Sequence, residues 1–263
     1  MYTMSGRITV LYMDQHIAVI SKPCGLLSVP APGRKEKSAQ GILESLMRRS
    51  GCYSARHRPF AVHRLDRYTS GVLLFALNEA AQQKIMGSWR GMVKSRLYRA
   101  VSENPRRNPL PQSGIISAPL ELNAYNQGYV PKSGGRISAR THFAVIERGK
   151  AYTLFELELD TGRKNQIRAH LASKGYPIAG DKSHNARTNP FGRLALHART
   201  LSFLHPYNDK ELRFEVEEPG DWLKTVRETH SAQTHAPRPA DRRPQRRESA
   251  HNDFISAGTH RKK

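Results

Sequence analysis

Residues 63–75 constrain the fold most strongly, because thirteen residues there join a charged motif to an apolar run. The segment is HRLDRYTSGVLLF, and its aspartate, Asp66, lies between two arginines. The apolar residues 72–77 predict a buried strand, and residues 69–71 predict the turn before it. We therefore expect Asp66 at a tight corner beside a sheet, where a reactive side chain can be held rigidly.

Asp66 also has a simpler interpretation, because an aspartate in a turn commonly pairs with a neighbouring arginine or caps the turn. The net charge of the chain favours a functional role for Asp66. Lysine and arginine number 43 against 22 acidic residues, which gives a formal net charge of +21. A surface of this sign attracts a polyanion through its phosphates, without regard to base sequence. We expect a nucleic-acid partner whose affinity falls steeply with salt.

Composition predicts two regions. Residues 1–228 carry enough apolar side chains for one folded domain, whereas residues 229–263 are predicted to be a basic tail without fixed structure. After Ser231 there are eight lysines and arginines and three acidic residues. No apolar run approaches the roughly 20 residues that cross a bilayer, and the N-terminus lacks a secretory pattern. We expect a cytoplasmic monomer away from membranes, with Cys24 and Cys52 as ordinary thiols.

Sequence periodicity predicts strands alternating with helices. The residues 104–114, rich in Pro, Arg, Asn and Gly, predict a loop between two halves of a sheet. Lys22 is expected on a loop at the end of a strand, facing a ligand. The predicted strands are 8–12, 17–20, 72–77, 95–101, 139–146, 152–159 and 212–216; the predicted helices are 39–49, 78–90 and 164–174; residues 194–204 fit a helix or a strand.

Asp66, Arg168 and Tyr98 are candidates for one reactive site. A carboxylate on a phosphate-binding surface repels its substrate unless a fixed cation neutralises it, so Asp66 needs an arginine such as Arg168 nearby. Tyr98, on a predicted strand, offers the aromatic face on which a base removed from an RNA helix can stack. The residues alone do not prove that these three side chains meet.

The motif HRLDRYTSG resembles the HRLDxxTSG catalytic motif of the RluA-type pseudouridine synthases. Residues 14–26 are similar to the opening segment of that family, 161–171 to its TGRxHQIRxHL segment, and 175–181 to its GxPIxGD turn. Leu196-His197-Ala198 and His205-Pro206 match further family positions. The resemblance covers residues 8–218.

The resemblance implies a fold and a set of roles. The fold is of the α+β class, with a mixed, mostly antiparallel sheet in two halves, flanking helices and a central cleft. Asp66 takes the catalytic role, Tyr98 stacks on the target uracil, and Arg168 pairs with the aspartate. The residues expected to contact RNA are Lys22, Arg64, Arg67, Arg163 and Lys164. Two positions depart from the family pattern: Asn165 replaces a usual histidine, and Ser21 a usual asparagine.

The implied reaction is isomerisation of uridine within ribosomal or transfer RNA. The glycosidic bond breaks, the uracil turns over, and its C5 joins the ribose, by either a covalent or a glycal route. No cofactor or metal is expected, in keeping with the lack of a GxGxxG, GxxxxGK[ST] or HExxH motif. The GxSxG elbow of many hydrolases and the paired carboxylates of a glycosidase are also missing. The alternative is a non-catalytic RNA-binding or ribosome-assembly protein on the same fold.

Overall fold

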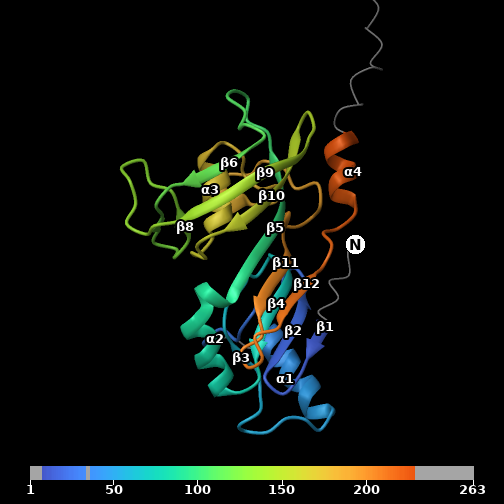
Figure 1. The fold of residues 1–263 in the computed structure, drawn as a ribbon. Helices are drawn as coiled ribbons and strands as arrows, with labels where there is room; N and C mark the ends of the chain where they lie inside the picture. Colours follow the sequence, from blue (N-terminus) through green and yellow to red (C-terminus); the bar gives the residue numbers. More distant parts are fainter. Residues whose placement is uncertain (1–7, 34–35, 229–263) are drawn as a thin grey trace, which may run out of the picture. The chain divides into compact units, whose positions relative to one another are not determined.

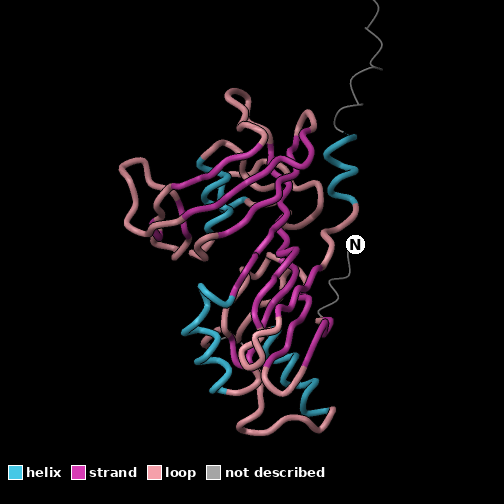
Figure 2. The backbone as a smooth tube through the Cα atoms, in the orientation of Figure 1, coloured by secondary structure: helices cyan, strands magenta, loops and turns pink. Residues whose placement is uncertain are grey.

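The computed structural model describes residues 8–33 and 36–228, in which one large sheet organises the fold (Figure 1). Ten strands of this described part form the sheet, in the order β1-β2-β4-β11-β5-β10-β9-β6, with β3 beside β4 and β12 beside β11. The strand path and the helices flanking it can be followed in Figure 2. All described residues belong to one unit, Met1–Ala232.

The elements have the following bounds. The strands of the large sheet are β1 (Thr9–Met13), β2 (Ile17–Lys22), β3 (Phe60–Ala61), β4 (Ser70–Ala76), β5 (Val93–Glu103), β6 (Ser113–Ser117), β9 (Arg140–Arg148), β10 (Tyr152–Leu159), β11 (Leu196–Leu204) and β12 (Glu211–Glu215). A separate pair is formed by β7 (Glu121–Leu122) and β8 (Gly128–Tyr129). The helices are α1 (Ala39–Arg49), α2 (Glu79–Met92), α3 (Gln166–Ser173) and α4 (Asp221–Glu228), with a 3₁₀ turn at Lys182–His184.

The first half of the sheet is covered on both faces, which explains the uninterrupted apolar run in β4. Every residue of β4 is buried. Leu73 and Phe75 pack in a core with α1, whereas Leu74 and Ala76 point to the other face and pack with α2. A strand enclosed on both faces has no polar side to present, so its sequence does not alternate.

The second half of the sheet has a core of its own. Phe155 and Leu157 of β10 are fully buried, and Ile167 and Leu171 of α3 pack in the same cluster. Trp222 of α4 joins this cluster with its side chain completely enclosed. Helix α3 therefore has its position fixed by apolar contacts, and any polar side chain on its remaining face is held with it.

The two halves meet where β4 and β11 lie parallel. The register pairs Ser70 with His197 and Gly71 with Ala198, and β5 passes from this junction into the second half (Figure 1). Gly71 has φ +114°, and any side chain there would overlap the backbone of Ala198. Glycine is required both by this backbone conformation and by the close approach. The turn predicted after Asp66 is thus also the seam of the sheet.

A buried hydrogen-bond chain ties this seam together. The Ser70 hydroxyl donates to Nδ1 of His197 at 2.8 Å and accepts from Arg193 at 2.5 Å, while Nε2 of His197 donates to the carbonyl of Val216 at 2.9 Å. Burial lowers the pKa of His197 to about 4. The imidazole is therefore neutral at physiological pH, which is the state in which Nδ1 can accept a hydrogen bond.

Most sequence-based elements agree with the structure, including the α+β class with a mostly antiparallel sheet in two halves. Residues 194–204, left open between helix and strand, lie mainly in strand β11. The helix predicted at 164–174 begins later, at Gln166, so Arg163 and Lys164 lie on the preceding loop. Helix α4 was not predicted at all. The tail proposed for residues 229–263 lies outside the described residues.

In the described part of the chain, every helix is too short or too polar to span a membrane.

We predict that His197 makes the fold sensitive to acid. Because the folded-state pKa lies near 4 and an unfolded histidine titrates near 6.5, the unfolded state binds its proton first as the pH falls. Stability should fall between pH 6.5 and 4, by about 3 kcal/mol from this group. Urea unfolding at several pH values measures this loss.

The matched comparison is His197→Gln against His142→Gln, since His142 on β9 has 40% of its side chain exposed. The His197 variant should lose part of the decline between pH 6.5 and 4, and the His142 variant should retain it. A His197 variant with the wild-type pH dependence would show that this imidazole is not the titrating group.

Candidate active site

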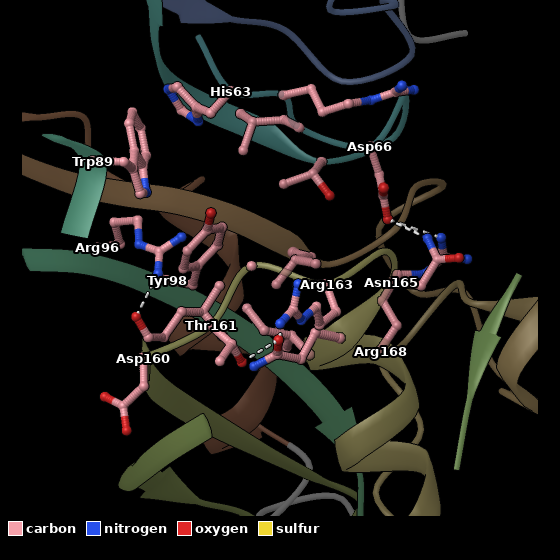
Figure 3. Close-up of a pocket in the computed structure, with 18 of the residues that line it drawn as sticks. His63, Asp66, Trp89, Arg96, Tyr98, Asp160, Thr161, Arg163, Asn165 and Arg168 are labelled. Atoms are coloured by element: carbon pink, nitrogen blue, oxygen red, sulfur yellow. Dashed lines mark hydrogen bonds and ion pairs between the residues drawn. The ribbon is translucent and has the colours of Figure 1, made fainter. Parts of the chain in front are cut away.

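A cavity of about 420 Å³ opens between the two halves of the sheet. Its walls come from residues around Asp66, from the C-terminal part of α2, from Arg96 and Tyr98 of β5, and from the segment that leads into α3. Figure 3 shows Asp66 on one side of this cavity and Trp89 on the other, with Tyr98 between them in that view. The central cleft expected from sequence is present.

Asp66 lies on the predicted corner. The backbone N–H of Thr69 donates to the Asp66 carbonyl at 3.1 Å, which closes the turn. The preceding residue, Leu65, is buried, and both its backbone groups bond to the Ser28 hydroxyl, at 2.7 and 3.0 Å. The side chain of Asp66 remains 30% exposed and faces the cavity. A buried neighbour on one side and a closed turn on the other fix the direction of the carboxylate.

Arg168 meets Asp66 from the opposite half of the sheet. Its Nη1 donates to Oδ2 of Asp66 at 3.1 Å. The rest of the guanidinium is bound by Asp181, from Nε to Oδ2 at 2.7 Å and from Nη2 to Oδ1 at 2.8 Å. Such a two-point contact fixes the plane of an arginine as well as its position. Arg168 is therefore held by one carboxylate and presented to the other.

Asp181 is nearly enclosed, with 1% of its side chain exposed. Burial alone would raise its carboxyl pKa, but hydrogen bonds and charge from Arg168 and His184 hold that pKa well below the usual range. Ser183 also donates to Oδ1 of Asp181, at 2.8 Å. His184 in turn contacts the carbonyl of Gly128 at 2.9 Å, so β8 is linked to the same network.

Asn165 is the second donor to Asp66. Its side-chain nitrogen lies 2.6 Å from Oδ2 of Asp66, the same oxygen that Arg168 contacts. The amide oxygen of Asn165 accepts from the backbone N–H of Gly128 at 3.2 Å. The residue has φ +54°, a left-handed conformation that asparagine tolerates better than most residues. Its position at the start of α3 places the amide against the carboxylate.

Tyr98 and Arg96 form the wall between the two ends of the cavity. Burial and the nearby Asp66 raise the pKa of the Tyr98 hydroxyl, although Arg96 opposes this shift, so the ring stays neutral at physiological pH. Arg96 is anchored by a hydrogen bond from Nη2 to the carbonyl of Leu159 at 2.7 Å. A neutral aromatic ring beside a fixed guanidinium suits a planar, electron-poor heterocycle.

His63 is neutral as well. Burial lowers its pKa to about 3, and its Nε2 accepts the backbone N–H of Leu74 at 3.0 Å. Its ring packs against Trp89 of α2, with 5.0 Å between the ring centroids. The first residue of the HRLD motif thus supports the wall of the cavity and carries no charge into it.

The structure unites Asp66, Tyr98 and Arg168 around one cavity. It divides the residues expected to contact RNA. Arg64 and Arg163 line the cavity and are exposed, and Lys164 is exposed beside it on the loop before α3.

Lys22 and Arg67 do not line the cavity. The expectation that Lys22 faces a ligand is wrong, because its side chain is fully buried and its ammonium donates to the carbonyls of Pro23, Leu26 and Arg67 at 2.8 to 3.1 Å. Desolvation lowers the pKa of Lys22 to about 8. Arg67 is outside the cavity lining and binds the Gly25 carbonyl at 3.0 Å and Glu36 at 3.1 Å.

Sequence reasoning missed three contributors. Asp181 belongs to a recognised motif, and a buried carboxylate there should have suggested a partner for a cation. Asn165 was noted only as a departure from a family pattern, although its amide touches Asp66. Arg96 stands two residues before Tyr98, so both side chains project to the same face of β5, and this spacing was the available signal.

Taken together, the cavity combines the Asp66 carboxylate, whose charge Arg168 compensates, with a neutral aromatic ring and an arginine-bearing rim. A carboxylate with only one of its oxygens bound can act as a nucleophile or a base through the other. In the described part of the chain, no cluster of three or more His, Cys, Asp or Glu side chains is arranged to hold a metal ion. The arrangement suits a reaction at a planar base attached to a phosphate-bearing backbone.

The sequence matches known proteins over most of its length. A family model described as RNA pseudouridylate synthase matches residues 16–173. An uncharacterised RNA pseudouridine synthase, YlyB of Bacillus subtilis, is 33% identical over 221 residues, covering 83% of this chain and 72% of the relative. The ribosomal large subunit pseudouridine synthase D of Xylella fastidiosa is 32% identical over 228 residues, with 81% and 67% covered.

The fold has known counterparts too. The structure of human RNA pseudouridylate synthase domain containing 1 aligns with a TM-score of 0.65 at 22% identity, covering 81% of this chain and 84% of that one. Human RNA pseudouridylate synthase domain containing 4 aligns with a TM-score of 0.64, also at 22% identity, covering 83% and 91%. At this identity the likeness concerns the fold.

We predict that Asp181→Asn destabilises the protein by about 3 kcal/mol, because it leaves the guanidinium of Arg168 buried without its main counter-charge. Urea unfolding at pH 7 measures the change. Glu217→Gln is the matched control, since Glu217 is exposed, and it should stay within about 0.5 kcal/mol of wild type. Equal unfolding midpoints for Asp181→Asn and wild type would refute the anchoring role of Asp181.

Proposed function

The chain belongs to the RNA pseudouridylate synthase family, and we propose from this that it converts uridine to pseudouridine in ribosomal RNA. The family match confirms the resemblance to RluA-type enzymes, so the protein is an isomerase. The single observation that carries the proposal is the Asp66 carboxylate, held by Arg168 beside Tyr98 in a cavity with a basic rim. Ribosomal RNA is proposed because relatives such as the Xylella fastidiosa enzyme are named for the large ribosomal subunit.

We propose separate roles for the two oxygens of Asp66. Arg168 and Asn165 both donate to Oδ2, at 3.1 and 2.6 Å. Oδ1 is then the oxygen that can reach the ribose of a bound uridine. It either adds to the sugar or removes a ribose proton, and the glycosidic bond from N1 breaks in both routes. The fixed donors compensate the carboxylate charge without any reorganisation during the reaction.

Tyr98 is proposed to hold the uracil while it turns. After the N1 bond breaks, the ring must rotate and bring C5 to the ribose carbon, without leaving the cavity. A neutral phenol provides a flat face for stacking and no competing charge. When C5 bonds to the sugar, the Asp66–sugar bond breaks in the covalent route, or Asp66 returns the ribose proton in the glycal route. C5 then loses its own proton and N1 gains one, so the product has the composition of the substrate. No cofactor is needed for this balance.

The rim of the cavity is proposed to bind the RNA backbone. Arg64, Arg163 and Lys164 are exposed around the opening, where each can neutralise a phosphate. Arg64 lies two residues before Asp66 and is suited to fill the place that the extruded nucleotide leaves in its helix. These contacts set affinity and register, whereas the cavity selects the base.

We also propose a division of labour along the chain. Residues 1–228 form the catalytic domain, and the basic residues after 229 add affinity through charge alone. The protein is proposed to work as a cytoplasmic monomer. The non-catalytic alternative is not favoured, because a protein that only bound RNA would have no use for a carboxylate in a cavity where phosphate must approach.

The direct test maps pseudouridine in ribosomal RNA from cells that lack this gene, with complementation by wild type and by Asp66→Ala. One or more uridines should lose the modification in the deletion strain, regain it with wild type and remain unmodified with the variant. Restoration by Asp66→Ala would support the RNA-binding alternative instead. In vitro, Asp66→Asn should lower turnover of ribosomal RNA at least about 10³-fold while leaving RNA binding in place.

Asn165 gives a sharper prediction. Asn165→Asp keeps the size, the tolerance of positive φ and the bond to Gly128, but it sets a second carboxylate against Asp66. Turnover should fall about 100-fold, with little change in the KM for RNA, because the amide acts on the carboxylate rather than on substrate binding. Steady-state kinetics on ribosomal RNA measure both terms.

Two control variants separate the effect of the Asn165 side-chain amide from the effect of the backbone conformation at that position. Asn165→Gly permits the same φ and removes only the side chain, so it should lose about 10-fold in turnover. Asn165→His supplies a ring N–H donor and should retain more activity than Asn165→Gly. If Asn165→Asp turned over at the wild-type rate, the amide would have no role in positioning Asp66.

A further inference from the structure

The cavity does not end at the residues that surround Asp66. A second hollow of about 600 Å³ lies along α2 and reaches Leu204, Pro206 and Asp209. The two hollows share Met86, Trp89 and Arg90 on their walls. The reaction just proposed needs neither the shared residues nor the second hollow. The surface therefore offers room for more than one nucleotide.

Trp89 is placed as a platform between the hollows. Its ring is only partly exposed, and it packs against the neutral ring of His63, which Leu74 holds by a backbone hydrogen bond. Figure 3 shows Trp89 on the Arg96 side of the cavity, away from Asp66. An indole supported on one side and open on another provides a fixed surface on which any base can stack.

Positive charge accompanies this platform. Arg90 is exposed and belongs to both hollows, and Lys84 lines the second hollow beside the ring of Tyr207, at 4.8 Å from its centroid. Besides Asp66, two carboxylates line the hollows. Asp160 in the first hollow is paired with His142 at 3.0 Å, and Asp209 lies in the second hollow.

The exposed face of α2 also leaves room for a bound strand. Gly87 and Gly91 are one helical turn apart, and a Cβ added at either would meet no neighbouring atom within 4 Å. Glycine weakens a helix, and here neither packing nor backbone conformation requires it. Ser88 lies between them, also exposed. A face of small residues beside the hollow lets another backbone approach closely.

We propose that single-stranded RNA next to the target uridine crosses this surface, with one base stacked on Trp89 and a phosphate bound by Arg90. The strand then continues along α2 past Gly87 and Gly91. The inference rests on the proposed function, and it deepens it by naming the substrate form: the uridine must have an unpaired neighbour. A duplex would not present that base to the indole.

Trp89 allows a direct test, because the chain has only two tryptophans and the other, Trp222, is fully buried. A 12-nucleotide oligouridylate should quench the fluorescence of the wild-type protein. Trp89→Phe should abolish the quenching, since only Trp222 remains, while binding the oligomer nearly as well in fluorescence anisotropy. Wild-type binding without any quenching would overturn the proposal.

Affinity provides the second measurement. Trp89→Leu should bind the oligouridylate about 10-fold more weakly, within the range for losing one stacked base. Arg90→Gln should weaken binding and flatten its salt dependence by about one ion. Lys150→Gln is the charge-matched control, because Lys150 is exposed in the β9–β10 turn, at the opposite end of β10 from Leu159, which lines the cavity. Equal affinities for Trp89→Leu and wild type would exclude the stacking site.

Gly87→Ala separates fold from function. Alanine should raise the thermal midpoint, because it favours the helix, and yet weaken binding of the oligomer by crowding the strand. A more stable variant with unchanged binding would exclude the path along α2. These readouts do not depend on turnover. An inactive protein that still shows the quenching would refute the proposed function alone, and an active protein without it would refute this inference alone.

Discussion

The site depends on the two-point contact between Arg168 and Asp181, both of which are largely enclosed. A buried guanidinium is costly unless a carboxylate satisfies it, and an arginine held at two points cannot turn away. Because Asp181 already binds two of its three nitrogens, Arg168 has Nη1 left to offer to Asp66. The pairing of Asp66 is thus set by a second carboxylate that never faces the cavity.

This contact functions only because the halves of the sheet are joined a few residues away. Asp66 belongs to the first half of the sheet, and Arg168 and Asp181 belong to the second half. The close approach of Gly71 to Ala198, where the strands leave no room for a side chain, lies five residues after Asp66. The HRLDRYTSG motif therefore combines two demands, a reactive corner and the closure of the sheet. This explains why its small residues are as restrictive as its charged ones.

Local pattern predicted the elements whose burial is simple. The apolar run of β4, the apolar–polar alternation of β10 and the asparagine cap of α2 are patterns within a single segment. Each can therefore be recognised from adjacent residues. Long-range contacts were not readable in this way. Lysine usually lies at the protein surface, and only the structure shows that three carbonyls accept hydrogen bonds from the ammonium of Lys22. Helix α4 was missed because its stability comes from Trp222 entering a core built by distant strands.

The titratable groups of the cavity show how the fold limits its charges. Burial keeps His63 and Tyr98 neutral, by lowering one pKa and raising the other. Two charged side chains of the lining are fixed by partners: Arg96 by the Leu159 carbonyl, and Asp66 by Arg168 and Asn165. Because these two side chains are held in place, their contribution to the field at the ribose changes little while the uracil turns. The proposed rearrangement benefits from such an environment, because charges already in place stabilise the transition state without reorganising while Asp66 acts on the ribose.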